Sequence, residues 1–209
     1  MNTMTPSVVQ NDRMTDGQTD KATDLFRSAL RKHQNEFDQN AVQQALGSKD
    51  LSKNLFAVFR ACVEMFSNLI VRIVKVDRTR TPKQALDATG RAQYTNSSVV
   101  ATMPRGDGDE VEVVFFKPDL SKLNGSISDD DLEKEYESCG LAPADPYYVA
   151  AVNKADPAFA DEHPNGTHWK DADGKWCYAV FGRWDGERGV DVRRGVNVWD
   201  DGWSFAGVR

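Results

Sequence analysis

The chain has 209 residues, of which 40% are hydrophobic and 28% are charged, and its formal net charge is -6. This length suits one domain or a domain with a tail, and a composition near the globular average excludes a wholly disordered chain and a membrane protein. The negative charge argues against nucleic acid and anionic lipid as partners, because both are polyanions.

The cysteines and the start of the chain indicate the compartment. Cys62, Cys139 and Cys177 lie far apart without paired spacing, and an odd number of cysteines cannot close into a full set of disulfides. The first twenty residues lack the basic start and apolar run of a secretory signal. The sequence therefore predicts a soluble, cytoplasmic protein.

The N-terminal third begins with a polar segment. Residues 1–20 are rich in Thr, Asp, Asn and Gln, bury too little apolar surface to offset the entropy of ordering, and are predicted to be a disordered tail. A first helix is predicted to start at Thr23 or Asp24, because apolar residues recur beyond these caps at helical spacing.

Two more helices are predicted before the first strand. Gln39 to Leu46 forms a short one that ends at Gly47, and a longer one starts at Ser48 or Asp50. The apolar stretch of this longer helix is too highly charged for a membrane span, because each charge at a bilayer centre costs about 2.5 to 3.5 kcal/mol.

The middle of the chain mixes strands and helices. Leu69 to Val76 is rich in β-branched residues and is predicted to be the first strand. Thr81 followed by proline is typical of a helix start, with Gly90 as its stop. Ser98 to Met103 and Glu110 to Lys117 are β-patterned around a turn-forming cluster, which predicts a hairpin.

The last third begins with helices and ends in strands. Ser128 is predicted to cap a helix that ends at Gly140, and Asp145 followed by proline to start another. From Thr167 to Arg209, short apolar segments separated by Asp-Gly pairs predict β structure throughout.

These elements predict an α+β fold in which N-terminal helices pack on a mainly antiparallel sheet with a Trp-rich C-terminal segment. We expect one domain over residues 21–209, helical over 21–68, mixed over 69–160 and β-rich over 161–209.

Tryptophan placement is the most uneven feature of the chain, since all five tryptophans lie between Trp169 and Trp203. The first interpretation is core building, because aromatic side chains dominate the packing of small sheets. The second is a recognition surface, since arginines alternate with the tryptophans and both are usual anchors of binding. It predicts a non-enzymatic binding module for a protein or small-molecule partner, with binding residues Arg183, Trp184, Arg188, Arg193 and Trp199.

A second hypothesis rests on the segment just before these strands. Asp161, His163 and His168 fall within eight residues, and Cys177 is predicted to face them across a hairpin. Carboxylate, imidazole and thiolate are zinc ligands, so the alternative function is a metal-dependent hydrolase or a metal-stabilised domain. The spacing matches no standard metal signature, and a surface turn with flanking histidines explains the same residues.

A third hypothesis concerns the N-terminal helices. Their apolar faces over residues 21–66 offer a surface through which the protein self-associates, with the sheet as scaffold.

Overall fold

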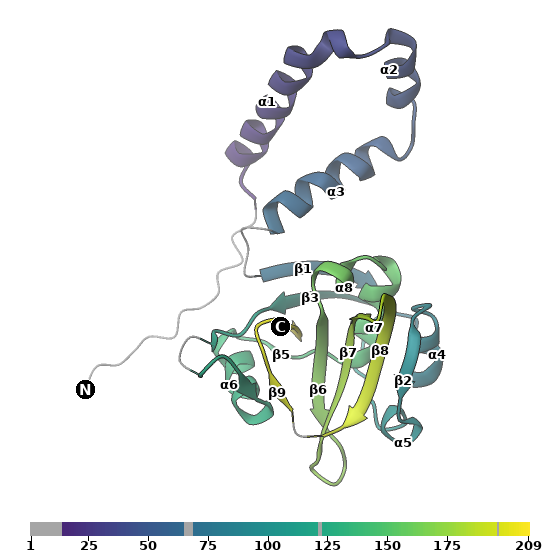
Figure 1. The fold of residues 1–209 in the computed structure, drawn as a ribbon, viewed down its shortest axis with the longest axis vertical. Helices are drawn as coiled ribbons and strands as arrows, with labels where there is room; N and C mark the ends of the chain where they lie inside the picture. Colours follow the sequence, from purple (N-terminus) through teal and green to yellow (C-terminus); the bar gives the residue numbers. More distant parts are fainter. Residues whose placement is uncertain (1–13, 65–68, 121–122, 196) are drawn as a thin grey trace, which may run out of the picture. The chain divides into compact units, whose positions relative to one another are not determined.

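The computed structural model describes residues 14–64, 69–120, 123–195 and 197–209. Its described residues divide into a helical unit up to residue 64 and a sheet unit from residue 69 onward (Figure 1). The helices and the mixed sheet confirm the predicted α+β class.

The helical unit contains α1 (Asp16–His33), η1 (Gln34–Glu36), α2 (Gln39–Leu46) and α3 (Leu51–Glu64). Helix α1 starts inside the segment predicted to be disordered, because Thr15 and Gln18 form a reciprocal capping box. Residues 1–13 of that segment lie outside the described residues.

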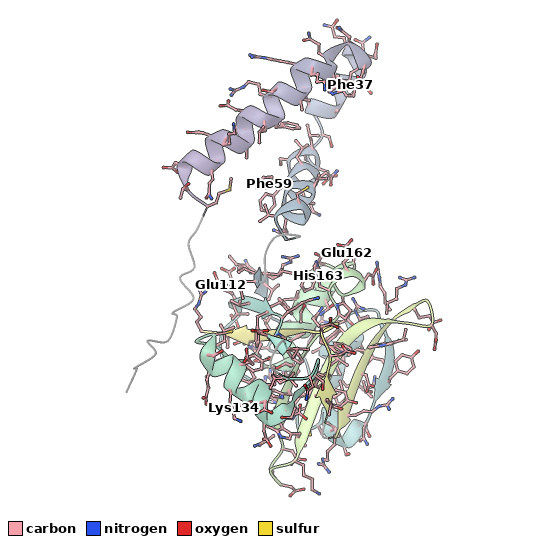
Figure 2. All side chains as sticks on the ribbon, turned by 60° about the vertical axis from the view of Figure 1, so that its left-hand side comes forward. Phe37, Phe59, Glu112, Lys134, Glu162 and His163 are labelled. Carbon is pink, nitrogen blue, oxygen red and sulfur yellow. The ribbon has the colours of Figure 1, made fainter. Side chains whose placement is uncertain are left out.

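No side chain described in the helical unit is buried, and most of its large apolar groups, Phe37 and Phe59 among them, are exposed (Figure 2). Within the described ranges, no helix combines the length and the apolar character needed to cross a bilayer.

The sheet unit is built on a mixed sheet with the strand order β1-β3-β10-β6-β7-β8-β2, and β5 pairs with β10. The pairs β10–β6 and β2–β8 are parallel and the other pairs of this sheet are antiparallel. Strands β4 and β9 form a separate pair. The elements are β1 (Leu69–Lys75), α4 (Pro82–Asp87), β2 (Ala92–Thr95), α5 (Ser97–Val100), β3 (Glu110–Phe116), β4 (Ile127–Ser128), α6 (Asp129–Ser138), β5 (Ala142–Pro143), α7 (Pro146–Ala155), α8 (Phe159–Glu162), β6 (Asn165–Lys170), β7 (Trp176–Trp184), β8 (Glu187–Arg194), β9 (Val198–Trp199) and β10 (Ser204–Val208).

The sheet has an apolar core on each face, because successive side chains of a strand point to opposite sides. On the first face, residues such as Val113 and Phe181 pack with helices α4, α5, α7 and α8. On the second face, Val114 and Phe116 pack with α6 and with the β4–β9 pair. Both helix groups come from the middle of the chain.

The predicted hairpin of Ser98 to Met103 with Glu110 to Lys117 is wrong. Asn96 caps the backbone N–H of Ser98, so the first segment enters helix α5 and places Val99 and Val100 in the core. The second segment is β3, which pairs with β1 and β10 instead. The pattern of a short apolar run such as Ser98 to Met103 fits either a strand or a buried helix. Here the cap at Asn96 selects the helix.

The start of α7 is fixed by Asp145, as predicted from the Asp-Pro pair. Its carboxylate accepts hydrogen bonds from the backbone N–H groups of Tyr148 and Gly106. It also lies 3.0 Å from Nη1 of Arg78, and both side chains are largely buried. One side chain therefore caps the helix, holds the loop before β3 and balances a buried guanidinium.

Replacing Asp145 with Ala should lower the free energy of unfolding of the sheet unit by about 3 kcal/mol or more, because Arg78 is left buried without its partner. The matched control is Asp38→Ala. It also removes a helix cap, that of α2, but the lost carboxylate accepts only one hydrogen bond, from the backbone N–H of Ala41. It should leave unfolding of the sheet unit unchanged in urea denaturation followed by near-UV circular dichroism. Equal effects of the two substitutions would contradict this role of Asp145.

Candidate functional site

The five residues predicted to form a Trp- and Arg-rich surface lie in three places. Arg183 and Arg188 are directly opposite each other on β7 and β8. Both approach Asp161 of α8, with Nη2 of Arg188 2.7 Å and Nη1 of Arg183 3.7 Å from its Oδ2 atom. Hydrogen bonds from Arg188 hold the pKa of Asp161 below its ordinary value. Arg183, Arg188 and Asp161 therefore form a salt-bridge cluster on the first face of the sheet.

Trp199 lies in the core of the second face and does not contribute to an exposed surface. It is 5% exposed, and its Nε1–H donates to Oδ1 of Asp129 at 2.9 Å. Trp169 and Trp176 are buried as well. Core building, the first interpretation of the tryptophan cluster, therefore accounts for these three residues.

Trp184 lies on the second face, where two glycines make room for its indole. Gly182 and Gly189 are opposite each other on β7 and β8. A Cβ atom on Gly189 would lie 2.6 Å from Cζ3 of Trp184, and one on Gly182 would lie 3.2 Å from its Cζ2. The ring of Tyr94 meets the indole edge-to-face, with the ring centroids 6.2 Å apart. The two rings form an aromatic corner on β7, β8 and β2.

Arg193 lies farther along the same face, beside Asp191. Its Nε is 2.9 Å from Oδ1 of Asp191, a half-buried carboxylate whose pKa is raised by burial although Arg193 acts in the opposite direction. Next to this pair runs a groove of about 460 Å³, lined by Gln93, Tyr94, Thr95, Asn96, Arg193 and Arg194. We call this the β2 groove.

The sequence pattern identified Trp184 and Arg193 of this surface but not Tyr94 and Asp191. Tyr94 belongs to β2, a strand of four residues that was not predicted. Asp191 was not among the predicted binding residues. The alternation along β8 gives a usable signal, since Gly189, Asp191 and Arg193 must share one face.

The predicted metal ligands do not converge. Asp161 is engaged by the two arginines. His163 lies at the end of α8 (Figure 2). Its ring centroid is 5.3 Å from that of Phe159. Cys177 is buried on β7, with its Sγ 3.9 Å from Oδ2 of Asp171. In the register of β6 and β7, Cys177 faces Trp169, whereas His168 faces Tyr178. His168 and Cys177 therefore point to opposite faces of the sheet.

His168 instead sits between two carboxylates of α6. Its Nδ1 lies 3.2 Å from Oδ1 of Asp129, and its Nε2 lies 2.8 Å from Oε1 of Glu133. The imidazole is 1% exposed and stacks on Trp176 at 4.5 Å. The carboxylates contact opposite ring nitrogens, so they do not surround a common point. Over the described ranges, no group of three or more His, Cys, Asp or Glu side chains is arranged to hold a metal ion.

Comparison of the chain with protein-family models, curated proteins and solved structures gives no match.

Gly189→Ala should displace Trp184, because the added methyl would overlap the indole, and should lower the free energy of unfolding by about 1 to 3 kcal/mol. The matched control is Gly195→Ala, where the nearest atoms would lie 4.0 Å from the added Cβ. Urea denaturation measures the stability of both variants, and acrylamide quenching of the fluorescence reports whether Trp184 is displaced. A Gly189→Ala protein with wild-type stability and quenching would contradict the described packing of Trp184.

The environment of His168 predicts a pH dependence of stability. Desolvation acts to lower its pKa, but the contacts with Asp129 and Glu133 prevail and raise it above its ordinary value. A folded-state pKa above the unfolded value of about 6.5 stabilises the protein fully below that pH, and the contribution is lost as the pH rises through the folded pKa. Urea midpoints should therefore fall above about pH 6.5 in wild type. The decline should be absent in His168→Gln. Identical pH profiles of the urea midpoint in the two proteins would refute this role of His168.

Proposed function

We propose that this chain is a non-enzymatic binding protein that holds an extended, acidic polypeptide segment along β2. The observation that carries the proposal is that Tyr94, Arg193 and Arg194 all line the β2 groove, with Trp184 packed beside Tyr94. Tyrosine, tryptophan and arginine are the residues that most often anchor protein interfaces.

The edge of β2 supports a strand-like ligand. Strand β2 is last in the sheet order, and among the described residues β8 is its only strand partner. A terminal strand presents backbone N–H and C=O groups that an added strand satisfies, and side-chain pockets beside the edge then provide specificity. The β2 groove lies along this strand and its continuation to Asn96.

The two arginines support an acidic partner. The side chain of Arg193 is 56% exposed, and that of Arg194, paired with Asp171, is 38% exposed. A guanidinium carries five N–H donors, so one carboxylate within the chain leaves donors for a second from the partner. Tyr94, which is 42% exposed, adds an apolar contact with a polar tip.

The metal-dependent alternative on Asp161, His163 and His168 has no comparable support, because each of these side chains is engaged separately by its own neighbours. Self-association through the helical unit remains a hypothesis that rests on its exposed apolar side chains, such as Phe26 and Phe56.

Selection from a random peptide display library tests the proposal without a known partner. The selected peptides should be enriched in Asp and Glu. Tyr94→Ala and the double substitution Arg193→Gln with Arg194→Gln should each weaken binding at least tenfold, or about 1.4 kcal/mol, in fluorescence anisotropy. Arg188→Gln is the matched control, because it removes an arginine that does not line the β2 groove, and it should bind like wild type.

Two outcomes would refute the proposed function. One is a library that yields no binder. The other is a set of binders whose affinity falls equally with Arg188→Gln, because a general effect of charge would then explain the result.

A further inference from the structure

The apolar surface of the protein is concentrated on the helical unit. Among the residues that the structure describes, twelve of the fifteen exposed large apolar side chains belong to this unit. The other three lie on three different strands of the sheet unit. Exposed apolar groups in this number, gathered on one small unit, indicate a surface that another molecule covers.

The two longer helices each carry their apolar side chains as one stripe. The α1 stripe consists of Ala22, Leu25, Phe26, Ala29 and Leu30. The α3 stripe consists of Leu55, Val58, Phe59, Cys62 and Val63. Both sets follow the i, i+3, i+4, i+7, i+8 spacing of an amphipathic helix that packs against a neighbour.

The helical unit does not cover these stripes itself. None of its described side chains is buried, and Phe26 and Phe59 are 46% and 38% exposed. Isolated helices shorter than about 12 to 15 residues are marginal in water, and most helical stability comes from packing of the apolar face. Helix α2 has 8 residues and α3 has 14. The unit therefore needs a cover from elsewhere to stay helical in water.

The area that the unit exposes matches that of a stable interface. Its four described phenylalanines are 38 to 56% exposed, which amounts to about 300 to 500 Å² in total if a whole aromatic side chain offers about 150 to 250 Å². The eight other exposed large apolar side chains add an area of the same order. A standard protein interface buries about 800 Å² on each partner. Two copies that cover each other through this unit therefore reach the size of a stable dimer.

The charge of the unit favours a second copy over a membrane or a nucleic acid. Residues 14–64 contain seven acidic and seven basic side chains, so the unit is formally neutral and the net charge of -6 lies in the rest of the chain. A helix that lies on an anionic membrane has an excess of Lys and Arg on its polar face, and a nucleic-acid partner needs the same excess. On α1, Asp24 and Arg27 lie away from the stripe and pair with each other at 2.7 Å. Two neutral units approach each other without net repulsion.

The sheet unit of the same chain offers no matching apolar surface. Within the described ranges it exposes large apolar side chains only at Ile73, Tyr94 and Val198, which lie on β1, β2 and β9. Three separate side chains cannot cover two stripes. A second copy brings stripes of the same chemistry and spacing, and an interface that uses the same surface on both copies closes as a two-fold dimer.

From these observations we propose that the helical unit is a dimerisation module, in which the α1 and α3 stripes of two copies pack into one shared core. Four helices that bury such stripes against one another form a bundle. Because the unit has no core of its own, its folding and its association are a single step. The proposal does not depend on peptide binding, since the β2 groove is lined by residues of the sheet unit alone.

Sedimentation velocity and circular dichroism of the full chain over a dilution series test the proposal. We expect the mass of two chains at high concentration and a far-UV helical signal that falls as the dimer dissociates. The near-UV signal should stay constant, because all five tryptophans belong to the sheet unit. A chain that is monomeric at every concentration would overturn the proposal, as would a dimer that dissociates without losing helical signal.

Substitutions in the stripes identify the surface that associates. Phe26→Gln and Phe59→Gln should each raise the Kd of the dimer at least about tenfold, and glutamine is a better helix former than phenylalanine, so a loss of helix propensity cannot explain the effect. The matched controls Ile73→Gln and Val198→Gln remove side chains of the sheet unit that are 68% and 70% exposed, and they should leave the Kd unchanged.

Two further results would contradict the proposal. Equal weakening of the dimer by the two control substitutions would place the contact on the sheet unit. A helical signal that a monomeric chain gains only with phosphatidylglycerol vesicles would assign the stripes to a membrane surface. Near-UV spectra like that of wild type confirm in each variant that the sheet unit remains folded.

Discussion

The buried carboxylate of Asp129 is the interaction on which the second face of the sheet depends. It accepts hydrogen bonds from the backbone N–H of Asn197 at 2.8 Å and from Trp199 Nε1–H at 2.9 Å, and it contacts Nδ1 of His168. Burial acts to raise its pKa, but these donors prevail and hold it below the ordinary value. One charged group thus ties α6 to β6 and to the segment that carries β9.

The position of Asp129 at the start of α6 determines where the next side chains of that helix lie. Glu133 comes one turn later on the same face, so the two carboxylates reach the two nitrogens of a single imidazole. Leu132 and Tyr136 extend into the core beneath them. The first turn of a helix favours negative charge, which adds to the stabilisation of Asp129. A buried charge network of this kind fixes which way the helix faces.

The proposed binding site arises where the sheet lacks a neighbouring strand. Strand β2 ends the sheet. Tyr94 and Arg193 both line the groove beside it. The alternation of side chains along β6, β7 and β8 sends the same tryptophan-rich sequence partly into the core and partly to this edge.

Local signals in the sequence were sufficient for much of the fold. The caps Thr81, Ser128 and Asp145 were identified correctly because capping depends on a few neighbouring residues. Strand β2 and helix α5 were missed because a strand of four residues has little pattern of its own and Asn96 outweighs the β-branched run after it.

The candidate sites were only partly predictable, since the sequence identified Trp184, Arg193 and His168 but not their partners. Glu133 and Asp129 reach His168 from α6 through tertiary contacts, which no spacing along the chain reveals. The separation of His168 from Cys177 was accessible from strand alternation, given the register of the hairpin.

A double-mutant cycle on Asp129→Asn and His168→Gln tests the organising role of this pair most directly. The free energies of unfolding of wild type, the two single variants and the double variant give the coupling energy between the side chains. We predict a coupling of more than about 1 kcal/mol at pH 6, because each partner alone would be buried without its hydrogen-bonded counterpart. Effects that add to within about 0.5 kcal/mol would contradict the organising role of Asp129 and His168.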